Sequence, residues 1–149
     1  MKKTTYMVAA AFWALSTLAG CTDDAASGPE FEQANLKAAV QGRWAVERID
    51  YRLCRNSNCN TRHYPGTAQD YVEFKVDSAY LLHAGSANGT AKEAFRADYS
   101  QPGAILLSSP GWTGRFDVRV LQSKELVLEN TFPGRDPEAV FTDTYYLKR

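Results

Sequence analysis

From residue 43 onward, apolar and polar residues alternate with a period of two, which is typical of half-buried β-strands. The segment 72–76 shows this best, because Val72, Phe74 and Val76 alternate with Glu73 and Lys75. The pattern predicts eight strands: 43–53, 70–76, 79–84, 91–99, 104–108, 114–121, 124–130 and 138–148. One polar face on each strand favours an antiparallel sheet.

Turn signals separate these segments and keep every connection short. Four Pro–Gly dipeptides suit the central positions of type II turns, in which glycine accepts a positive φ; they are Pro65-Gly66, Pro102-Gly103, Pro110-Gly111 and Pro133-Gly134. Asn88-Gly89 predicts another tight turn. No helical segment follows residue 42, so parallel crossovers are excluded and a meander is the simplest topology. Closure would remove the exposed edges, and we therefore expect an all-β, antiparallel eight-stranded up-and-down barrel in preference to a sandwich.

A short helix is expected before the first strand, over residues 30–40. Pro29 suits the start of a helix, and Leu36 and Val40 share one face, with Phe31 near it. Gly42 would end this helix.

The first residues have the organisation of a cleaved secretory signal. Lys2 and Lys3 precede an apolar run from Val8 to Leu15, and small residues follow. The whole apolar stretch is shorter than the ~20 residues that span a bilayer, which argues against a membrane helix. Secretion without lipidation would explain the charges and the apolar run, but not the cysteine that comes directly after Leu-Ala-Gly.

The residues Leu18-Ala19-Gly20-Cys21 resemble the lipobox of bacterial lipoproteins. The resemblance implies cleavage after Gly20, a diacylglycerol on the Cys21 thiol and acylation of the new amine. Several acyl chains on one residue anchor a protein firmly. The expected organisation is a signal peptide over 1–20, a lipidated N-terminus and flexible tether over 21–29, and a barrel domain over 30–149.

The expected address is the outer membrane, because Thr22 stands where an aspartate would resemble an inner-membrane retention signal. The acidic pair Asp23-Asp24 resembles a surface-export signal, but it also fits a solvated tether. The sequence leaves both the periplasmic face and the cell surface open.

Removal of the first 20 of the 149 residues leaves 129, which is enough for one domain. Loss of Lys2 and Lys3 lowers the 17 basic residues to 15, against 17 acidic ones. A slightly acidic chain argues against nucleic acid as a partner. We expect a monomer attached to the membrane through its acyl anchor.

Cys54 and Cys59 are the two cysteines that remain when Cys21 is acylated. Export would place them in an oxidising compartment, where a disulfide across the turn-rich segment between them is expected. A metal or redox pair is the alternative, but the spacing suits neither a zinc site nor a thioredoxin-like motif. We therefore expect no metal and no cofactor.

The residues Gly42-Arg43-Trp44, at the start of the first strand, resemble the Gly-x-Trp signature of lipocalins and related calycins. The short helix before them and the closing segment 145–149 look like the lipocalin-like domains of bacterial lipoproteins. The resemblance implies that Trp44 closes one end of the barrel and stacks against a cation, either Lys148 or Arg149. The second and third motifs of the family are not evident.

No pattern of catalytic residues is present, and His63 and His83 come without a local nucleophile or metal-ligand motif. We therefore expect a binding protein rather than an enzyme. The expected ligand is a small apolar or amphipathic molecule at the open end of the barrel, with Tyr51, Tyr71, Tyr80 and Trp112 as candidate contacts. The alternative is a protein-binding module, such as a hydrolase inhibitor or a subunit of an envelope complex. A connected apolar cavity above ~300 Å³ would favour the small ligand, whereas a filled interior beneath an exposed aromatic loop would favour a protein partner.

Overall fold

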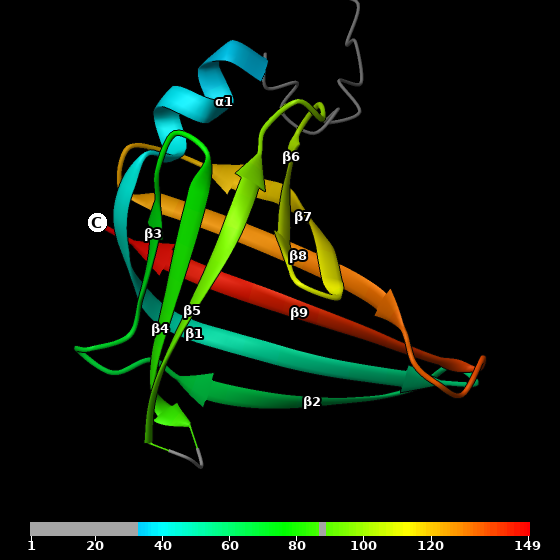
Figure 1. Ribbon diagram of the computed structural model, residues 1–149. Coiled ribbons are helices and arrows are strands. Elements are labelled where there is room, and N and C mark those ends of the chain that lie inside the picture. Colours follow the sequence, from blue (N-terminus) through cyan, green and yellow to red (C-terminus); the bar gives the residue numbers. More distant parts are fainter. Residues whose placement is uncertain (1–32, 87–88) are drawn as a thin grey trace, which may run out of the picture.

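One helix and nine strands make up the part of the chain that this computed structural model describes, residues 33–86 and 89–149 (Figure 1). The lipobox with Gly20 and Cys21, the tether, Phe31 and Asn88 lie outside the described residues. The elements are α1 (Gln33–Val40), β1 (Gly42–Arg55), β2 (Asn58–Pro65), β3 (Tyr71–Phe74), β4 (Ser78–Ser86), β5 (Gly89–Asp98), β6 (Ala104–Ser109), β7 (Trp112–Leu121), β8 (Glu125–Pro133) and β9 (Ala139–Lys148).

Eight of the strands form a closed barrel. Strands β3 to β9 pair in chain order, β1 pairs with β3, and β9 returns to pair with β1, so that the sheet closes on itself. All of these pairings are antiparallel. The fold is therefore the predicted all-β, antiparallel eight-stranded up-and-down barrel with a short N-terminal helix.

Strand β2 is a ninth strand that the sequence did not predict. It pairs with β1 from Arg48↔Pro65 to Arg55↔Asn58. The two residues between the strands, Asn56 and Ser57, have φ angles of 48° and 68°, which is the geometry of a two-residue hairpin turn. The alternation rule missed β2 because seven of its eight residues are exposed, so that neither face carries an apolar pattern.

The four Pro–Gly dipeptides divide into two kinds. Gly103 and Gly111 have positive φ angles, as a type II turn requires. Gly66 and Gly134 do not, so the prediction is wrong there. Both instead extend strand pairing, because the Gly66 amide donates to the Glu47 carbonyl at 2.9 Å and the Gly134 amide donates to the Ala139 carbonyl at 2.8 Å.

Helix α1 covers one end of the barrel, which we call the closed end (Figure 1). Leu36 and Val40 are fully buried against the barrel core, as their shared face predicted. Trp44, at the start of β1, is also fully buried, and its Nε1 donates to the Val40 carbonyl at 2.8 Å. The helix and the first strand are therefore joined by one aromatic side chain.

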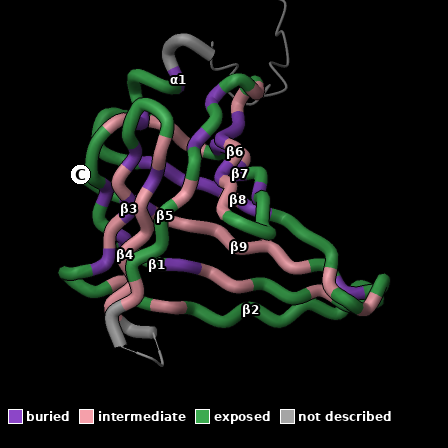
Figure 2. The backbone as a smooth tube through the Cα atoms, in the orientation of Figure 1, coloured by how far each residue is buried: buried purple, intermediate pink, exposed green. Residues whose placement is uncertain are grey.

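At the other end, four strands continue past the barrel and form a protruding sheet, which we call the arm. It consists of residues 51–55 of β1, 58–62 of β2, 130–133 of β8 and 139–143 of β9, and it extends to the right in Figure 1. Its two tips are joined, because Arg55 pairs with Asp136 at 2.8 Å and Asn56 donates to Glu138 at 2.8 Å. Burial falls toward the tips along β1 and β8, whereas β9 stays half-buried over most of its length and begins at the tip with the buried Ala139 (Figure 2).

Candidate binding groove

Side chains fill the interior of the barrel. A pocket there has a volume of only about 30 Å³, and Phe74, Phe116 and Tyr145 are among the residues around it. Such a space has room for only about one or two water molecules and is far smaller than the ~300 Å³ of a small-molecule site. The interior aromatic side chains Phe74, Phe116 and Tyr145 are therefore part of the core.

A larger space lies outside the barrel, on the inner face of the arm. This groove has a volume of about 460 Å³ and is open to solvent along one side. It is lined by Tyr51, Arg52, Leu53, Asn60, Arg62, Phe132, Phe141 and Asp143. The volume of the groove lies within the range of about 300–1,000 Å³ that is typical of small-molecule sites, but the groove lies beside the barrel mouth instead of within the barrel.

Strand register arranges the inner face of the arm in three rows, because directly paired residues point to the same side of a sheet. The polar row is Arg62, Tyr51, Asp143 and Asn130, from β2 across β1 and β9 to β8. The outer row, toward the tips, is Asn60, Leu53, Phe141 and Phe132. The inner row, toward the barrel, is Tyr64, Ile49, Tyr145 and Leu128. A line of polar groups is thus enclosed between two mainly apolar rows.

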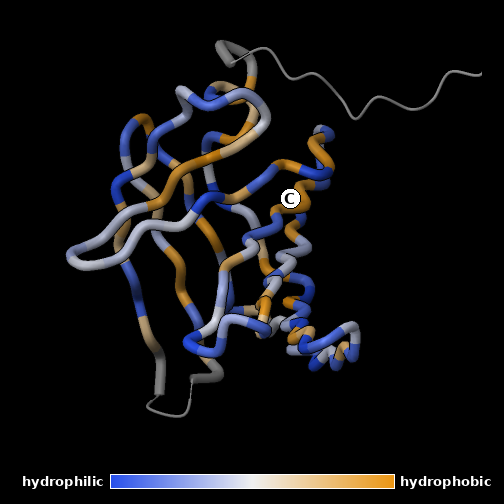
Figure 3. The backbone as a smooth tube through the Cα atoms, turned by 90° about the vertical axis from the view of Figure 1, so that its right-hand side faces the viewer, coloured by the Kyte–Doolittle hydropathy of each residue, from blue (hydrophilic) through white to orange (hydrophobic). Residues whose placement is uncertain are grey.

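The apolar part of the groove is centred on two stacked rings. Phe132 and Phe141 face each other across β8 and β9 with ring centroids 5.4 Å apart and an interplanar angle of 8°. Phe132 is 39% exposed and Leu53 is 36% exposed. Viewed from the side on which the arm lies, hydrophobic and hydrophilic segments alternate along the strands (Figure 3). The outer row therefore offers an apolar surface to a ligand.

The polar row contains a carboxyl group with altered acidity. Burial raises the pKa of Asp143 to about 6, because the ionised form loses contact with water. The pKa of the neighbouring Tyr51 is also raised, first by burial and then by the negative charge of Asp143. Burial likewise raises the pKa of Tyr145, in the inner row. A carboxylate in these surroundings can gain from a ligand that supplies positive charge or hydrogen-bond donors.

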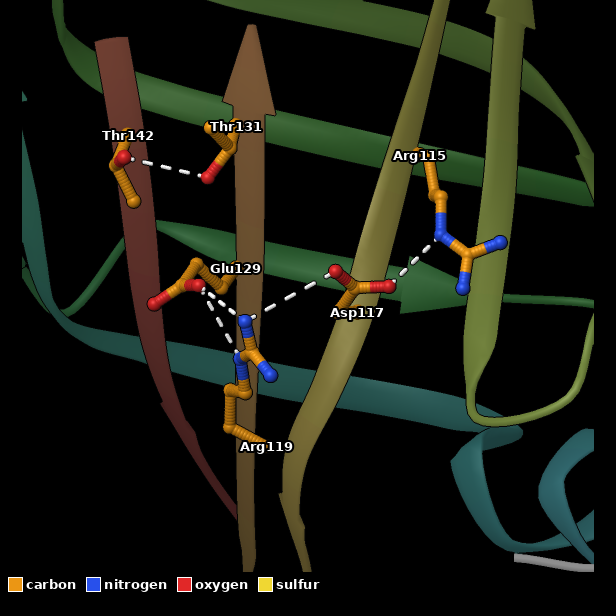
Figure 4. Close-up of polar contacts among 6 residues, drawn as sticks. All are labelled: Arg115, Asp117, Arg119, Glu129, Thr131 and Thr142. Atoms are coloured by element: carbon orange, nitrogen blue, oxygen red, sulfur yellow. Dashed lines mark hydrogen bonds and ion pairs between the residues drawn. The ribbon is translucent and has the colours of Figure 1, made fainter. Parts of the chain in front are cut away.

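Charged residues on the opposite, outer face of the sheet have partners (Figure 4). Arg119 pairs with Glu129 at 2.5 Å, and Arg115 pairs with Asp117 at 2.8 Å. Among the described residues, neither Arg62 nor Asp143 forms an ion pair. Arg62 and Asp143, which lack an ion pair within the described ranges, thus lie in the groove beside the exposed aromatic rings.

Two of the four predicted contact residues lie at the open end. Tyr51 is in the polar row, and Trp112 packs at the mouth of the barrel, with its ring centroid 5.5 Å from that of Phe95 and 6.3 Å from that of Phe116. The indole lies against Gly114, where an added Cβ would come within 2.6 Å of the ring. Trp112 therefore folds over the barrel mouth, although 41% of its surface remains exposed.

The other two predicted contacts lie on the outer face of the barrel, away from the groove. The Arg43 guanidinium lies 4.0 Å from the centroid of the Tyr71 ring. Tyr80 has the Nζ atoms of Lys75 and Lys92 at 4.9 Å and 5.1 Å from its ring centroid. Strand parity separates these rings from the groove, so the structure does not bring the four residues together.

At the closed end, Arg149 is the cation that lies over Trp44. Its guanidinium is 3.7 Å from the ring centroid, and it also donates to the carbonyls of Ala39 and Gln41. Lys148 turns away and pairs with Glu47 at 2.5 Å. The predicted Cys54–Cys59 disulfide is confirmed, and it joins directly opposite residues of β1 and β2 near the tip of the arm.

Three important groove residues were missed by reasoning from the sequence: Arg62, Asp143 and Phe141. Arg62 belongs to the strand that was not predicted. Asp143 and Phe141 lie in the last strand, which was placed correctly over 138–148, but nothing in one strand shows which residues lie opposite on its neighbours. An acidic residue at an inward position, between Phe141 and Tyr145, was the available signal.

Two further properties concern the described residues only. In residues 33–86 and 89–149, no helix combines the length and the apolar character needed to cross a membrane. The same part of the chain contains no group of three or more His, Cys, Asp or Glu side chains placed to hold a metal ion.

Comparison with known proteins gives a likeness to solved structures. No family model matches the chain, and no curated protein does. Among solved structures, the bovine lipocalin allergen Bos d 2 is similar, with 12% sequence identity and a TM-score of 0.47. The alignment covers 76% of this chain and 74% of the allergen chain.

Proposed function

We propose that this protein binds a small amphipathic molecule in the groove of the arm and that an acyl anchor on Cys21 holds it at the bacterial cell envelope. The observation that carries the binding proposal is the groove itself, about 460 Å³ beside a filled barrel. Its stacked Phe132 and Phe141 suit the apolar part of a ligand, and its polar row suits a head group. The barrel then acts as a rigid support for the site.

Binding can be tested with dodecyl maltoside, a neutral amphiphile, titrated into the full chain below its micelle concentration and followed by calorimetry. The groove-filling variant Leu53→Trp places a large ring in the outer row, and we expect it to weaken binding by at least roughly tenfold. Native mass spectrometry of the protein purified from its source would show whether a small molecule remains bound.

Val140→Trp is the matched control. Val140 is an exposed apolar residue of the same arm, but it neighbours Phe141 along β9 and therefore points to the opposite face. This variant should bind as the unmodified protein does. Equal binding by the unmodified protein and Leu53→Trp would show that the groove is not the site.

The anchor is tested separately, by Cys21→Ser in the source organism. This variant should leave the membrane fraction and appear in the soluble envelope fraction, because no thiol is left to acylate. Retention of the variant in membranes would contradict the lipid anchor. Neither result depends on what the groove binds.

A protein partner is the second candidate, and two observations favour it. The barrel interior is filled beneath Trp112, which is 41% exposed. The arm exposes apolar side chains on both faces, with Leu53 and Phe132 on the inner face and Val140, 43% exposed, on the outer face. A small molecule in the groove would cover only the inner face, whereas a protein that clasps the arm would cover both. Val140→Asp should therefore abolish binding of a protein partner and leave binding of a small amphiphile unchanged.

A further inference from the structure

Two residues of the polar row, Arg62 and Asp143, carry opposite charges that do not meet. Arg62 and Asp143 lie on either side of Tyr51, on β2 and β9. Two strand spacings separate them, which places their Cβ atoms about 10 Å apart. No ion pair joins Arg62 and Asp143 within the described part of the chain, and burial alone accounts for the raised pKa of Asp143. The inner face of the groove therefore presents one positive and one negative side chain. Arg52, the other cation of the groove lining, alternates with Tyr51 and Leu53 and donates to Cys59 Sγ at 3.3 Å.

A ligand with a single charge would satisfy only one of these sites. An anion at Arg62 would bring negative charge toward Asp143, and a cation at Asp143 would face Arg62 across Tyr51. A ligand that carries both charges removes both conflicts, since each of its charges meets an opposite one. Neutral polar head groups would leave the half-buried carboxylate without a charged partner.

The surroundings also set the order of groups along the ligand. The stacked rings of Phe132 and Phe141 lie on β8 and β9, and Asp143 follows on β9. Tyr51 comes next, on β1, and Arg62 lies at the far edge, on β2. From β8 to β2 the groove is therefore apolar, then negative, then positive. Aromatic faces beside Asp143 also favour a cation at that point.

We infer that the groove binds a zwitterionic amphiphile in which the cationic group lies between the apolar chain and the anionic group. The apolar chain lies along the outer row, the cation meets Asp143, and the anion meets Arg62. This inference rests on the proposed function, because it names the ligand class of the same groove.

The test compares amphiphiles that share a dodecyl chain, each titrated below its micelle concentration near neutral pH. Dodecyl sulfobetaine has the inferred order of chain, cation and anion, whereas dodecylphosphocholine has the reverse order of charges. Dodecyltrimethylammonium carries only the cation, and dodecyl sulfate carries only the anion. We expect the sulfobetaine to bind roughly tenfold more tightly than each of the other three.

Two variants assign the charges. Asp143→Asn should weaken binding of the sulfobetaine and of the cationic probe, but not of dodecyl sulfate. Arg62→Gln should weaken binding of the sulfobetaine and of dodecyl sulfate, but not of the cationic probe. Glu47→Gln and Arg119→Gln remove charges from the outer face, far from the groove by strand parity, and should change none of the four affinities.

The outcomes separate this inference from the proposed function. If Leu53→Trp weakens dodecyl maltoside binding but the four charged probes bind equally, the groove is a site and the inferred ligand class is wrong. A preference for dodecylphosphocholine would overturn the order of charges. Binding to zwitterionic lipid vesicles without binding of any monomeric probe would show that the arm contacts a bilayer surface, and would overturn the inference.

Discussion

The two ends of the barrel use aromatic and charged residues in opposite ways. At the closed end, Trp44 is fully buried, its Nε1 has a carbonyl partner, and Arg149 both covers its ring and donates to backbone oxygens. At the open end, Phe132 is partly exposed and Asp143 is half-buried without a cation. The closed end satisfies its polar groups from within the chain, whereas the groove leaves them for another molecule. Unsatisfied groups beside apolar surface are characteristic of binding sites, where stability is given up for function.

The largest loss of stability should come from a substitution at the closed end. Trp44→Ala removes a fully buried ring from between α1 and the barrel, and we expect it to lower the free energy of unfolding by about 3–5 kcal/mol. Chemical denaturation followed by circular dichroism measures this. Trp112→Ala, at the partly exposed mouth, should cost only about 1 kcal/mol. Equal losses of unfolding free energy in the two variants would show that the two ends do not differ in how much their tryptophans stabilise the fold.

The disulfide gives the next largest effect, at the arm. A bridge that closes so short a loop stabilises the folded state by about 2 kcal/mol through the entropy of the unfolded chain. Cys54→Ser combined with Cys59→Ser should therefore lower stability by that amount and weaken dodecyl maltoside binding, because Leu53 and Asn60 stand next to the two cysteines. Unchanged binding in the double variant would show that the groove does not depend on the bridge.

Arg149→Gln tests the cation over Trp44. We expect a loss of about 1 kcal/mol, because the variant gives up the cation–π contact. Lys148→Gln is the matched control in the adjacent residue. It breaks only the exposed ion pair with Glu47, which is worth about 0.5 kcal/mol at most. A larger loss for Lys148→Gln than for Arg149→Gln would reverse the roles assigned to the two cations.

The smallest expected change in stability concerns the groove, and it is a gain, whereas the variants above lose stability. The folded protein holds the Asp143 proton more tightly than the unfolded chain, so this residue favours the fold below about pH 4 and loses that contribution as the pH rises through about 6. Asp143→Asn should therefore raise stability by about 1 kcal/mol at about pH 7.5, after allowance for solvent screening. The difference should vanish at about pH 4.

Denaturation curves at both pH values measure this effect. The titratable groups around Asp143 are Tyr51 on β1, Arg62 on β2, Tyr145 on β9 and Glu93 on β5, whose charge acts on Tyr145. Tyr51, Tyr145 and Glu93 are acids and supply no positive charge that would stabilise the Asp143 carboxylate. A variant that is less stable than the unmodified protein at about pH 7.5 would show that Asp143 has a stabilising partner in the fold.

Alternation and turn chemistry were sufficient to predict the barrel. Strands with one buried face have a strict period of two, so Val72 and Phe74 identify β3, and Phe116 and Val118 identify β7. The Gly-x-Trp resemblance also indicated the closed end, where Trp44 and Arg149 now lie together. Alternation and turn residues are local features of the sequence, and the closed end depends on a single pair of residues, Trp44 and Arg149.

The groove could not be predicted in the same way, because it depends on register between distant strands. Arg62, Tyr51 and Asp143 form one row only because β2 and β9 both pair with β1 at specific residues. Strand β2 itself gave no signal, since its residues are polar on both faces. A single sequence contains no information on which of several inward positions lie opposite each other.

The position of β2 at the edge of the sheet also bears on self-association of the protein. Within the described sheet it pairs on one side only, so its other side presents free backbone donors and acceptors. Such an edge can recruit a strand from another molecule and start aggregation. Arg62, His63 and the terminal Pro65 are charged, polar and conformationally restricted residues of the kind that discourage this pairing. The polar composition that hid β2 from prediction is therefore also a composition that opposes edge-to-edge pairing between copies of the protein.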